Sequence, residues 1–207
     1  MKIRLPLFLA VQVILSLSLS AQSPPVAAGQ TSATEKPAPS APAIPFSSVI
    51  GAVLNDFPQN LEHISGELLL AEGGSENYSS RLELPGSLNC SVTRYHSNYD
   101  TSASWQAKMP VHEEFEKAAR EYQELYRKLQ TCTLQLADGT VLYLKGKWEP
   151  ARENIPFTTS SLRLTTAYGP YRNVNVELEL VYQVDAWAIN INIYNKDREE
   201  PTAGVNQ

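Results

Sequence analysis

The feature that most limits the fold is a strict alternation of apolar and polar side chains in residues 173–194. Large apolar residues fall at every second position there: Val174, Val176, Leu178, Leu180 and Tyr182, then Trp187, Ile189, Ile191 and Ile193. Successive side chains of a β-strand point to opposite faces, so this pattern buries one face and leaves the other polar. Parallel strands, covered on both faces, would be apolar throughout. We therefore expect an α+β fold, an antiparallel sheet with helices on its buried face.

The rest of the chain adds further strands of this kind and two helices. Apolar residues spaced by three and four predict helices over residues 47–56 and 111–131. The second carries acidic residues in its first turns and basic residues near its end, which complements the helix dipole. Asp138-Gly139 predicts a hairpin turn before residue 140. The predicted strands cover residues 64–70, 80–84, 88–96 and 104–109, then 140–148, 161–166, 173–184 and 186–194.

The first 20 residues have the three parts of a cleavable signal peptide. Lys2 and Arg4 give a positive start, an apolar run of about 11 residues follows, and Ser18 and Ser20 place small residues before the cut. The run is shorter than the roughly 20 residues that a bilayer span needs, so an uncleaved anchor is the weaker alternative. We expect an extracytoplasmic protein, periplasmic or secreted, with no stable membrane anchor after cleavage.

The segments on either side of the predicted domain have a different composition. Residues 21–45 consist largely of Pro, Ala, Ser and Thr, which predicts a disordered linker, and residues 196–207 are predicted to be a flexible tail. Cleavage of the signal removes Lys2 and Arg4, so the formal net charge falls from −5 to −7. An acidic protein without a Lys/Arg cluster repels nucleic acid. We therefore expect no nucleic-acid partner.

The order of the elements predicts an internal duplication. One helix followed by four strands occurs twice, in halves of about residues 46–109 and 110–195, which together form a single domain. Similar short sequences fall at matching places in the two halves, as do Trp105 and Trp187. An offset this long exceeds most solenoid repeats, so the pattern indicates two α-β4 halves of one body. The alternative is that two amphipathic α+β halves look alike by chance.

A helix packed on a four-stranded antiparallel sheet resembles the cystatin-like fold. Two such units in one small exported chain resemble the tandem architecture of the beta-lactamase-inhibitory proteins (BLIP-like). The resemblance covers the order of the elements, and no inhibitory motif of that family transfers to this sequence residue by residue. It implies an architecture and no particular function, because one fold serves many functions.

The two cysteines, Cys90 and Cys132, are both predicted to face the core between the sheet and the second helix. An oxidising compartment favours a disulfide between them. Such a bond would close a loop of about 40 residues and contribute on the order of 3 to 4 kcal/mol. Two buried free thiols are the alternative.

No set of residues matches a catalytic or metal-binding pattern. The segment from His112 to Glu116 begins like a zinc-binding helix, but Glu116 stands where the second histidine is needed. The glutamates of this helix, among them Glu113 and Glu114, are interpreted as a solvated face. We expect no enzyme activity, no cofactor and no metal.

The remaining candidates for function are side chains predicted to lie off the core. They are Tyr95 and Tyr99 near one strand end, and Tyr168, Tyr171 and Arg172 in the loop of residues 167–172. Tyrosines are common in interfaces because they bury much area at low entropic cost. We expect a non-catalytic module that binds a protein or peptide through its exposed sheet face or loops. The alternative is a carrier or sensor of a small apolar ligand held between the sheet and the second helix.

Overall fold

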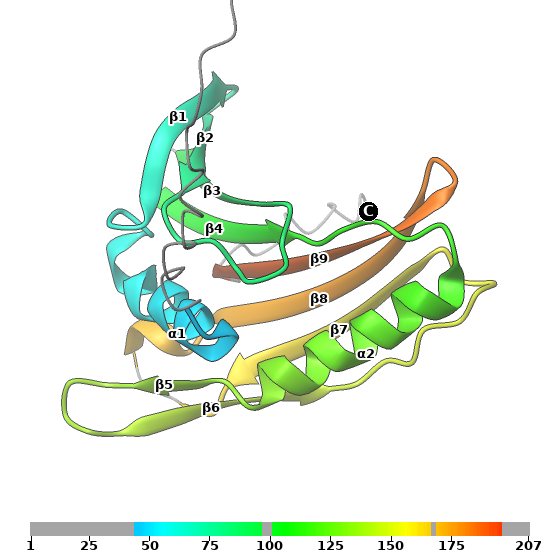
Figure 1. Ribbon diagram of the computed structural model, residues 1–207. Helices are drawn as coiled ribbons and strands as arrows, with labels where there is room; N and C mark the ends of the chain where they lie inside the picture. The colour runs from blue at the N-terminus through cyan, green and yellow to red at the C-terminus, as the bar shows by residue number, and fades with distance from the viewer. Residues whose placement is uncertain (1–43, 97–100, 167–168, 196–207) are drawn as a thin grey trace, which may run out of the picture. The chain divides into compact units, whose positions relative to one another are not determined.

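The computed structural model divides the chain into residues 1–40 and residues 41–207 (Figure 1). It describes residues 44–96, 101–166 and 169–195, all of them in the second unit. The predicted signal peptide, nearly all of the predicted linker and the predicted tail lie outside the described residues, as do Tyr99 and Tyr168. None of the described helices is both long and apolar enough to cross a membrane.

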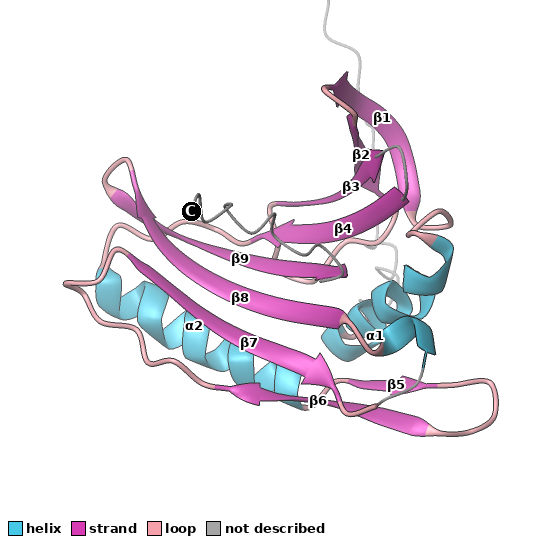
Figure 2. Cartoon of the chain, turned by 180° about the vertical axis from the view of Figure 1, so that it is seen from behind, coloured by secondary structure: helices cyan, strands magenta, loops and turns pink. Residues whose placement is uncertain are grey.

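The strands of the described chain form one antiparallel sheet in the order β1-β2-β3-β4-β9-β8-β7-β6-β5 (Figure 2). They are β1 (Ser65–Glu72), β2 (Ser75–Ser80), β3 (Asn89–His96), β4 (Thr101–Lys108), β5 (Thr133–Gln135), β6 (Val141–Lys147), β7 (Phe157–Leu164), β8 (Val174–Gln183) and β9 (Ala186–Asn195). The two predicted halves join where β4 pairs with β9, Trp105 opposite Ile193. The predicted α+β class and antiparallel sheet are confirmed.

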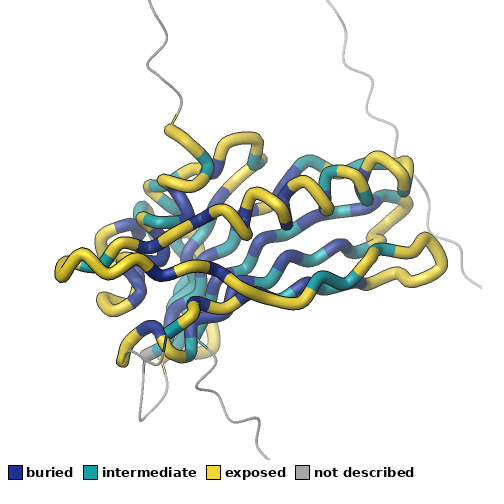
Figure 3. Tube along the Cα trace, turned by 90° about the horizontal axis from the view of Figure 1, so that it is seen from below, coloured by how far each residue is buried: buried dark blue, intermediate teal, exposed yellow. Residues whose placement is uncertain are grey.

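Along strands such as β9, buried and half-buried residues alternate (Figure 3). On the buried face, Trp105 of β4, Leu178 of β8 and Ile191 of β9 are wholly inaccessible to solvent. Tyr122 and Leu129 of α2 (Phe115–Gln130) pack onto this face and are equally buried. The core therefore includes the layer between the sheet and α2, and the equally buried Ile50 and Leu54 of the first helix belong to the same cluster.

The two helices take different places in the fold. α2 lies against β6, β8 and β9, as predicted for the helix of the second half. α1 (Phe46–Asp56) instead has its main contacts with β5 and α2, and Gly51 comes close to the carbonyl of Thr133. The expectation of an equivalent helix on each half is therefore wrong for α1. The internal duplication and the cystatin-like element order stay predictions.

Strand β1 shows the consequence of this placement of α1. Ile64, just before the strand, is buried, but Leu68, Leu69 and Leu70 are 54%, 62% and 59% exposed. The strand predicted over residues 64–70 is expected to bury one face, with Ile64, Leu68 and Leu70 on it. This is wrong for Leu68 and Leu70, because α1 packs elsewhere and no described helix has its main contacts with β1.

Two predicted boundaries also differ from the structure. The strand predicted over residues 80–84 lies earlier, at β2, because Gly73 and Gly74 turn the chain with φ of 57° and 82°. Helix α2 begins at Phe115 and not at residue 111, because the preceding segment pairs with β9. The His112 N–H donates to the Trp187 carbonyl at 2.9 Å, and the Trp187 N–H donates to the His112 carbonyl at 2.7 Å.

Candidate functional site

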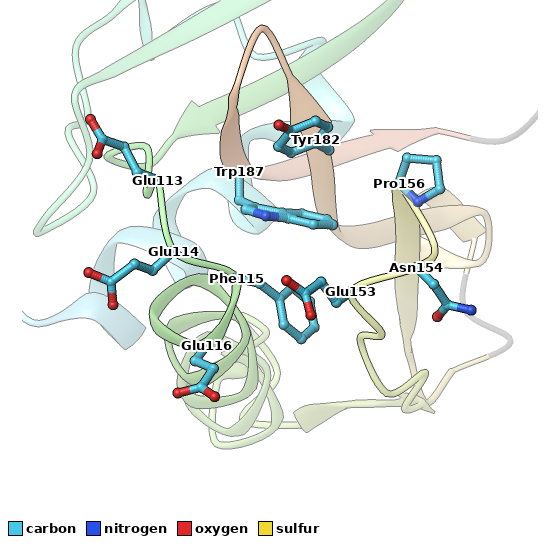
Figure 4. A pocket seen from close by; sticks show the side chains of 9 residues that line it. All are labelled: Glu113, Glu114, Phe115, Glu116, Glu153, Asn154, Pro156, Tyr182 and Trp187. Atoms are coloured by element: carbon cyan, nitrogen blue, oxygen red, sulfur yellow. The ribbon is translucent and has the colours of Figure 1, made fainter.

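A pocket of about 610 Å³ opens at the N-terminal end of α2, beside the hairpin of β8 and β9 (Figure 4). One wall is the start of α2 with the residues before it, and the other is the segment that leads into β7. The lining residues are Glu113, Glu114, Phe115, Glu116, Glu153, Asn154, Pro156, Tyr182 and Trp187. Three segments distant in sequence, residues 113–116, residues 153–156 and the β8–β9 hairpin, thus meet in this pocket.

Three aromatic rings form the floor of the pocket. The rings of Phe115 and Trp187 meet edge to face, with centroids 5.0 Å apart, and Tyr182 lies 5.1 Å from Trp187. Figure 4 shows the Trp187 ring between the other two. Such pairs contribute roughly 0.5 to 1.5 kcal/mol beyond the area that they bury. The rings therefore form a fixed apolar surface.

His112 fixes the segment before α2 to two neighbours at once. Its main chain exchanges two hydrogen bonds with Trp187, and its Nε2 contacts the carboxylate of Glu121 on α2. The Trp187 ring is thereby held at a set distance from the helix start. Within the described residues, no three His, Cys, Asp or Glu side chains are grouped so that they could hold a metal ion.

The rim of the pocket is acidic. Glu114 accepts a hydrogen bond of 2.7 Å from Lys117, which lowers the pKa of its carboxyl, and Glu116 lies 3.9 Å from Arg120. In the described part of the chain, Glu113 and Glu153 have no such ion pair. Glu113, Glu114 and Glu116 point outward from the α2 side, whereas Glu153 comes from the segment that leads into β7 (Figure 4). No lysine or arginine is among the described residues of the lining.

This combination of groups suits a positively charged ligand. Aromatic faces attract cations through their negative π-face. Tyr182, which is 45% exposed, offers the most accessible ring, because Trp187 is only 5% exposed. Uncompensated carboxylates attract the same charge over a longer range. The arrangement can therefore draw in a cation at the rim and hold its apolar stem or its charged head against the rings.

The residues predicted as an interaction surface do not line this pocket. Tyr171 is buried and the prediction that it is exposed is wrong, because the 3-10 helix η2 (Gly169–Tyr171) packs against η1 (Phe57–Gln59) and puts the ring into the core. Arg172 is exposed next to it, and Tyr95 is half-buried on β3. Tyr99 and Tyr168 lie outside the described residues.

The polar face of the sheet, the other predicted binding surface, uses many of its polar groups internally. Gln106 donates to Asn192 at 2.8 Å between β4 and β9, and Tyr194 donates to Glu177 at 2.5 Å between β9 and β8. Burial, together with this hydrogen bond, raises the pKa of Tyr194. Side chains that already satisfy one another offer fewer groups to a ligand, so the pocket is the stronger candidate.

The predicted disulfide is absent, and both cysteines are free and buried. Cys90 lies 3.4 Å from the N–H of Leu84, whereas the thiol of Cys132 donates to the carbonyl of Lys128 at 3.3 Å. The prediction is wrong because α2 lies on β6, β8 and β9 and not on β3, so its C-terminal end does not meet Cys90. Burial raises the pKa of both thiols, that of Cys132 to about 11.

Sequence reasoning missed the pocket for an identifiable reason. Phe115 has helical spacing and Trp187 has strand alternation, so both are interpreted as ordinary core residues. The signal available was the acidic run of Glu113, Glu114 and Glu116 around Phe115. The approach of Glu153 is a product of tertiary folding, because it is far from both segments in the sequence.

Comparisons with known proteins found no relative from which a function could be transferred. No protein-family model matches this chain, and neither a curated protein nor a solved structure matches it. The function therefore has to be inferred from the geometry of the pocket.

Proposed function

We propose that this protein is a non-catalytic, extracytoplasmic binding module whose pocket at the start of α2 holds a positively charged side chain of a protein or peptide partner. The observation that carries the proposal is an aromatic floor rimmed by four glutamates without a basic residue in the lining. A cation over an aromatic face gains about 0.5 to 1 kcal/mol at an exposed site and about 2 kcal/mol when desolvated. A lysine or arginine side chain fits, because its stem packs on rings while its head meets carboxylates.

The surroundings of the pocket favour a macromolecular partner over a free small cation. Val184 at the tip of the β8–β9 turn is 97% exposed, and Tyr182 in the pocket wall is 45% exposed. Both lie on the same hairpin, so a partner that places a cation against Tyr182 can also cover an apolar tip. Aromatic and apolar anchors surrounded by polar groups are the usual anatomy of a protein interface.

The charge of the whole chain supports the same partner. Its formal net charge is −5, and removal of the first 20 residues would make it −7. A field of this sign attracts a basic partner and raises its rate of association. Because exposed charges are screened by salt, the affinity is expected to fall as ionic strength rises.

A small apolar ligand is the alternative occupant. The layer between the sheet and α2, where such a ligand was expected, is filled by Tyr122, Leu129 and Leu178, all fully buried. The pocket volume of about 610 Å³ is within the range of ligand sites. Carboxylates at the rim disfavour an apolar molecule, so this alternative predicts binding that is insensitive to salt.

The test is an NMR titration with two pentapeptides that differ at one position, Gly-Ser-Arg-Ser-Gly and its uncharged citrulline counterpart. We expect the arginine peptide to shift the indole resonance of Trp187 and the citrulline peptide to bind several-fold more weakly. Glu153→Gln and Phe115→Ala should each weaken the arginine peptide several-fold, whereas Glu62→Gln, an exposed glutamate outside the pocket, should not. Equal binding of both peptides, or no effect of Glu153→Gln, would contradict the proposal.

A further inference from the structure

The free edge of β1 is the most apolar exposed segment of the described sheet. Leu68, Leu69 and Leu70 are consecutive and each is more than half exposed. β1 is the last strand of the sheet and pairs only with β2 among the described strands. An edge strand leaves main-chain N–H and C=O groups available, and native proteins normally protect such an edge with charges. Here leucines occupy its middle.

A bulge makes Leu69 the most prominent point of this edge. Leu68 pairs with Tyr78 and Leu70 pairs with Asn77, so Leu69 is an extra residue without a partner on β2. The strand with the extra residue is the longer one and bends around its partner. β1 is accordingly bent along its length (Figure 2).

We propose that β1 pairs with β1 of a second copy of this chain, antiparallel about a two-fold axis at Leu69. In this register Leu69 faces Leu69 and Leu68 faces Leu70, so all six leucines meet a leucine. Glu67 then faces Ala71, and Glu72 faces Gly66. The inference is independent of the proposed function of the pocket.

The carboxylates on β1 select this register over its neighbours. A shift of one residue would turn opposite side chains to different faces of the sheet, so a two-fold axis allows only shifts of two residues. Such a shift toward the C-terminus places Leu68 opposite Glu72, and one toward the N-terminus places Leu69 opposite Glu67. Either shift puts a carboxylate opposite a leucine and loses the pairing of Leu68 with Leu70. The arrangement of residues on β1 is thus self-complementary in one register.

The other edge of the sheet does not offer an equivalent partner. β5 is three residues long, its Leu134 is buried, and α1 packs against it. Pairing of β1 with β5 of another copy would also leave further edges open and extend into a filament, whereas pairing of β1 with β1 closes at two copies. The small size of the leucine contact makes this a reversible dimer.

The first experiment is sedimentation velocity of the protein purified from cells that express the full chain, over a wide range of concentration. We expect a reversible monomer–dimer equilibrium that Leu69→Lys shifts to monomer with an unchanged circular dichroism spectrum. Leu88→Lys is the matched control, because Leu88 is 65% exposed and lies outside β1. A wild-type protein that stays monomeric at every concentration overturns the proposal.

Cross-linking tests the register separately. Residues opposite each other in an antiparallel pair have Cα atoms about 4.5 to 5.5 Å apart, which a disulfide can bridge. Leu69→Cys should therefore oxidise to a covalent dimer, and Leu88→Cys should not. The native thiols do not interfere, since Cys90 and Cys132 are buried. Absence of a dimer from Leu69→Cys, or equal yields from both variants, overturns the two-fold axis at Leu69.

Discussion

Asp56, at the end of α1, organises the turn that leads into β1. Its Oδ2 accepts the main-chain N–H groups of His63 at 3.0 Å and Ile64 at 3.2 Å, and its Oδ1 lies 2.6 Å from His63 Nδ1. Within the turn, Asn60 and Leu61 have φ of 51° and 57°. Asn adopts this conformation readily, but it costs Leu61 about 1 to 2 kcal/mol. One buried carboxylate therefore holds a turn that the main chain does not favour by itself.

Replacement of this carboxylate should destabilise the fold. Asp56→Ala leaves two main-chain N–H groups without their acceptor, so we expect the free energy of unfolding to fall by about 1 to 3 kcal/mol. Asp56→Asn keeps one acceptor oxygen and should cost less. Urea denaturation measures both, with Glu62→Ala in the same segment as the control, since Glu62 is exposed. Equal loss from Asp56→Ala and Glu62→Ala would show that the carboxylate does not hold the turn.

Two buried acids should make the protein sensitive to alkaline pH. Burial raises the pKa of Cys132 from 9.0 to about 11 and the pKa of Tyr122 from 10.0 to about 12. Each group ionises at a lower pH in the unfolded chain than in the folded one, so the folded state binds more protons in between. The free energy of unfolding should therefore fall as pH rises above about 9.

Urea denaturation at a series of pH values checks this prediction. Cys132→Ala removes one of the groups with a raised pKa, so its stability should fall less steeply between pH 9 and pH 10 than that of the wild type. Tyr122→Phe should lose the hydrogen bond of 2.8 Å to Ser160 and flatten the curve at higher pH. A wild-type stability that is constant across this range would contradict the raised pKa values.

Among the elements, the β8–β9 hairpin carries the clearest local strain. Its two turn residues, Val184 and Asp185, have φ of 43° and 68°, as the tight turns of β-hairpins require. Asn and Gly adopt this conformation readily, whereas a β-branched residue such as Val does so rarely. Val184 is also exposed, so packing does not explain why it is there. Its position beside Tyr182 fits a role in contact with a partner.

Substitution in this turn should separate stability from binding. Val184→Asn should raise the free energy of unfolding by about 1 kcal/mol, because Asn tolerates the left-handed conformation. If Val184 contacts the partner, the same variant should bind it more weakly. Val141→Asn, at an exposed strand position, is the control and should not stabilise the protein. An unchanged or lower melting temperature for Val184→Asn would contradict the strain.

The elements differ in how well the sequence predicts them. β8, β9 and α2 follow from periodicity, because Leu178, Ile191 and Tyr122 recur at the spacing of their element. Periodicity identifies an apolar face but not the element that covers it, so Leu68 on β1 has a core pattern and yet is exposed. The pocket combines both cases, since Phe115 is predictable as a helix residue, whereas the presence of Glu153 in the same lining depends on the packing of distant segments.

At the scale of the molecule, the pairing of β4 with β9 removes any boundary between the predicted halves. Trp105 of β4 is fully buried, stands opposite Ile193, and donates its Nε1–H to Ser80 at 3.0 Å. Its environment thus belongs to both halves. α1 strengthens this continuity, because it comes from the first half and packs on β5 and α2 of the second.

A continuous core predicts one cooperative unfolding transition. Fluorescence of the three tryptophans and far-ultraviolet circular dichroism should give coincident curves in urea, as for a two-state domain. Ala107→Glu places a charge in the buried joint opposite Ile191, so it should lower the midpoint of both curves equally. Gln106→Glu, on the polar face of the same strand, is the control and should have a much smaller effect. Two separate transitions would mean that the halves fold independently. An Ala107→Glu variant in which only one probe shows a lower midpoint would mean the same, because damage to a shared core must destabilise both halves.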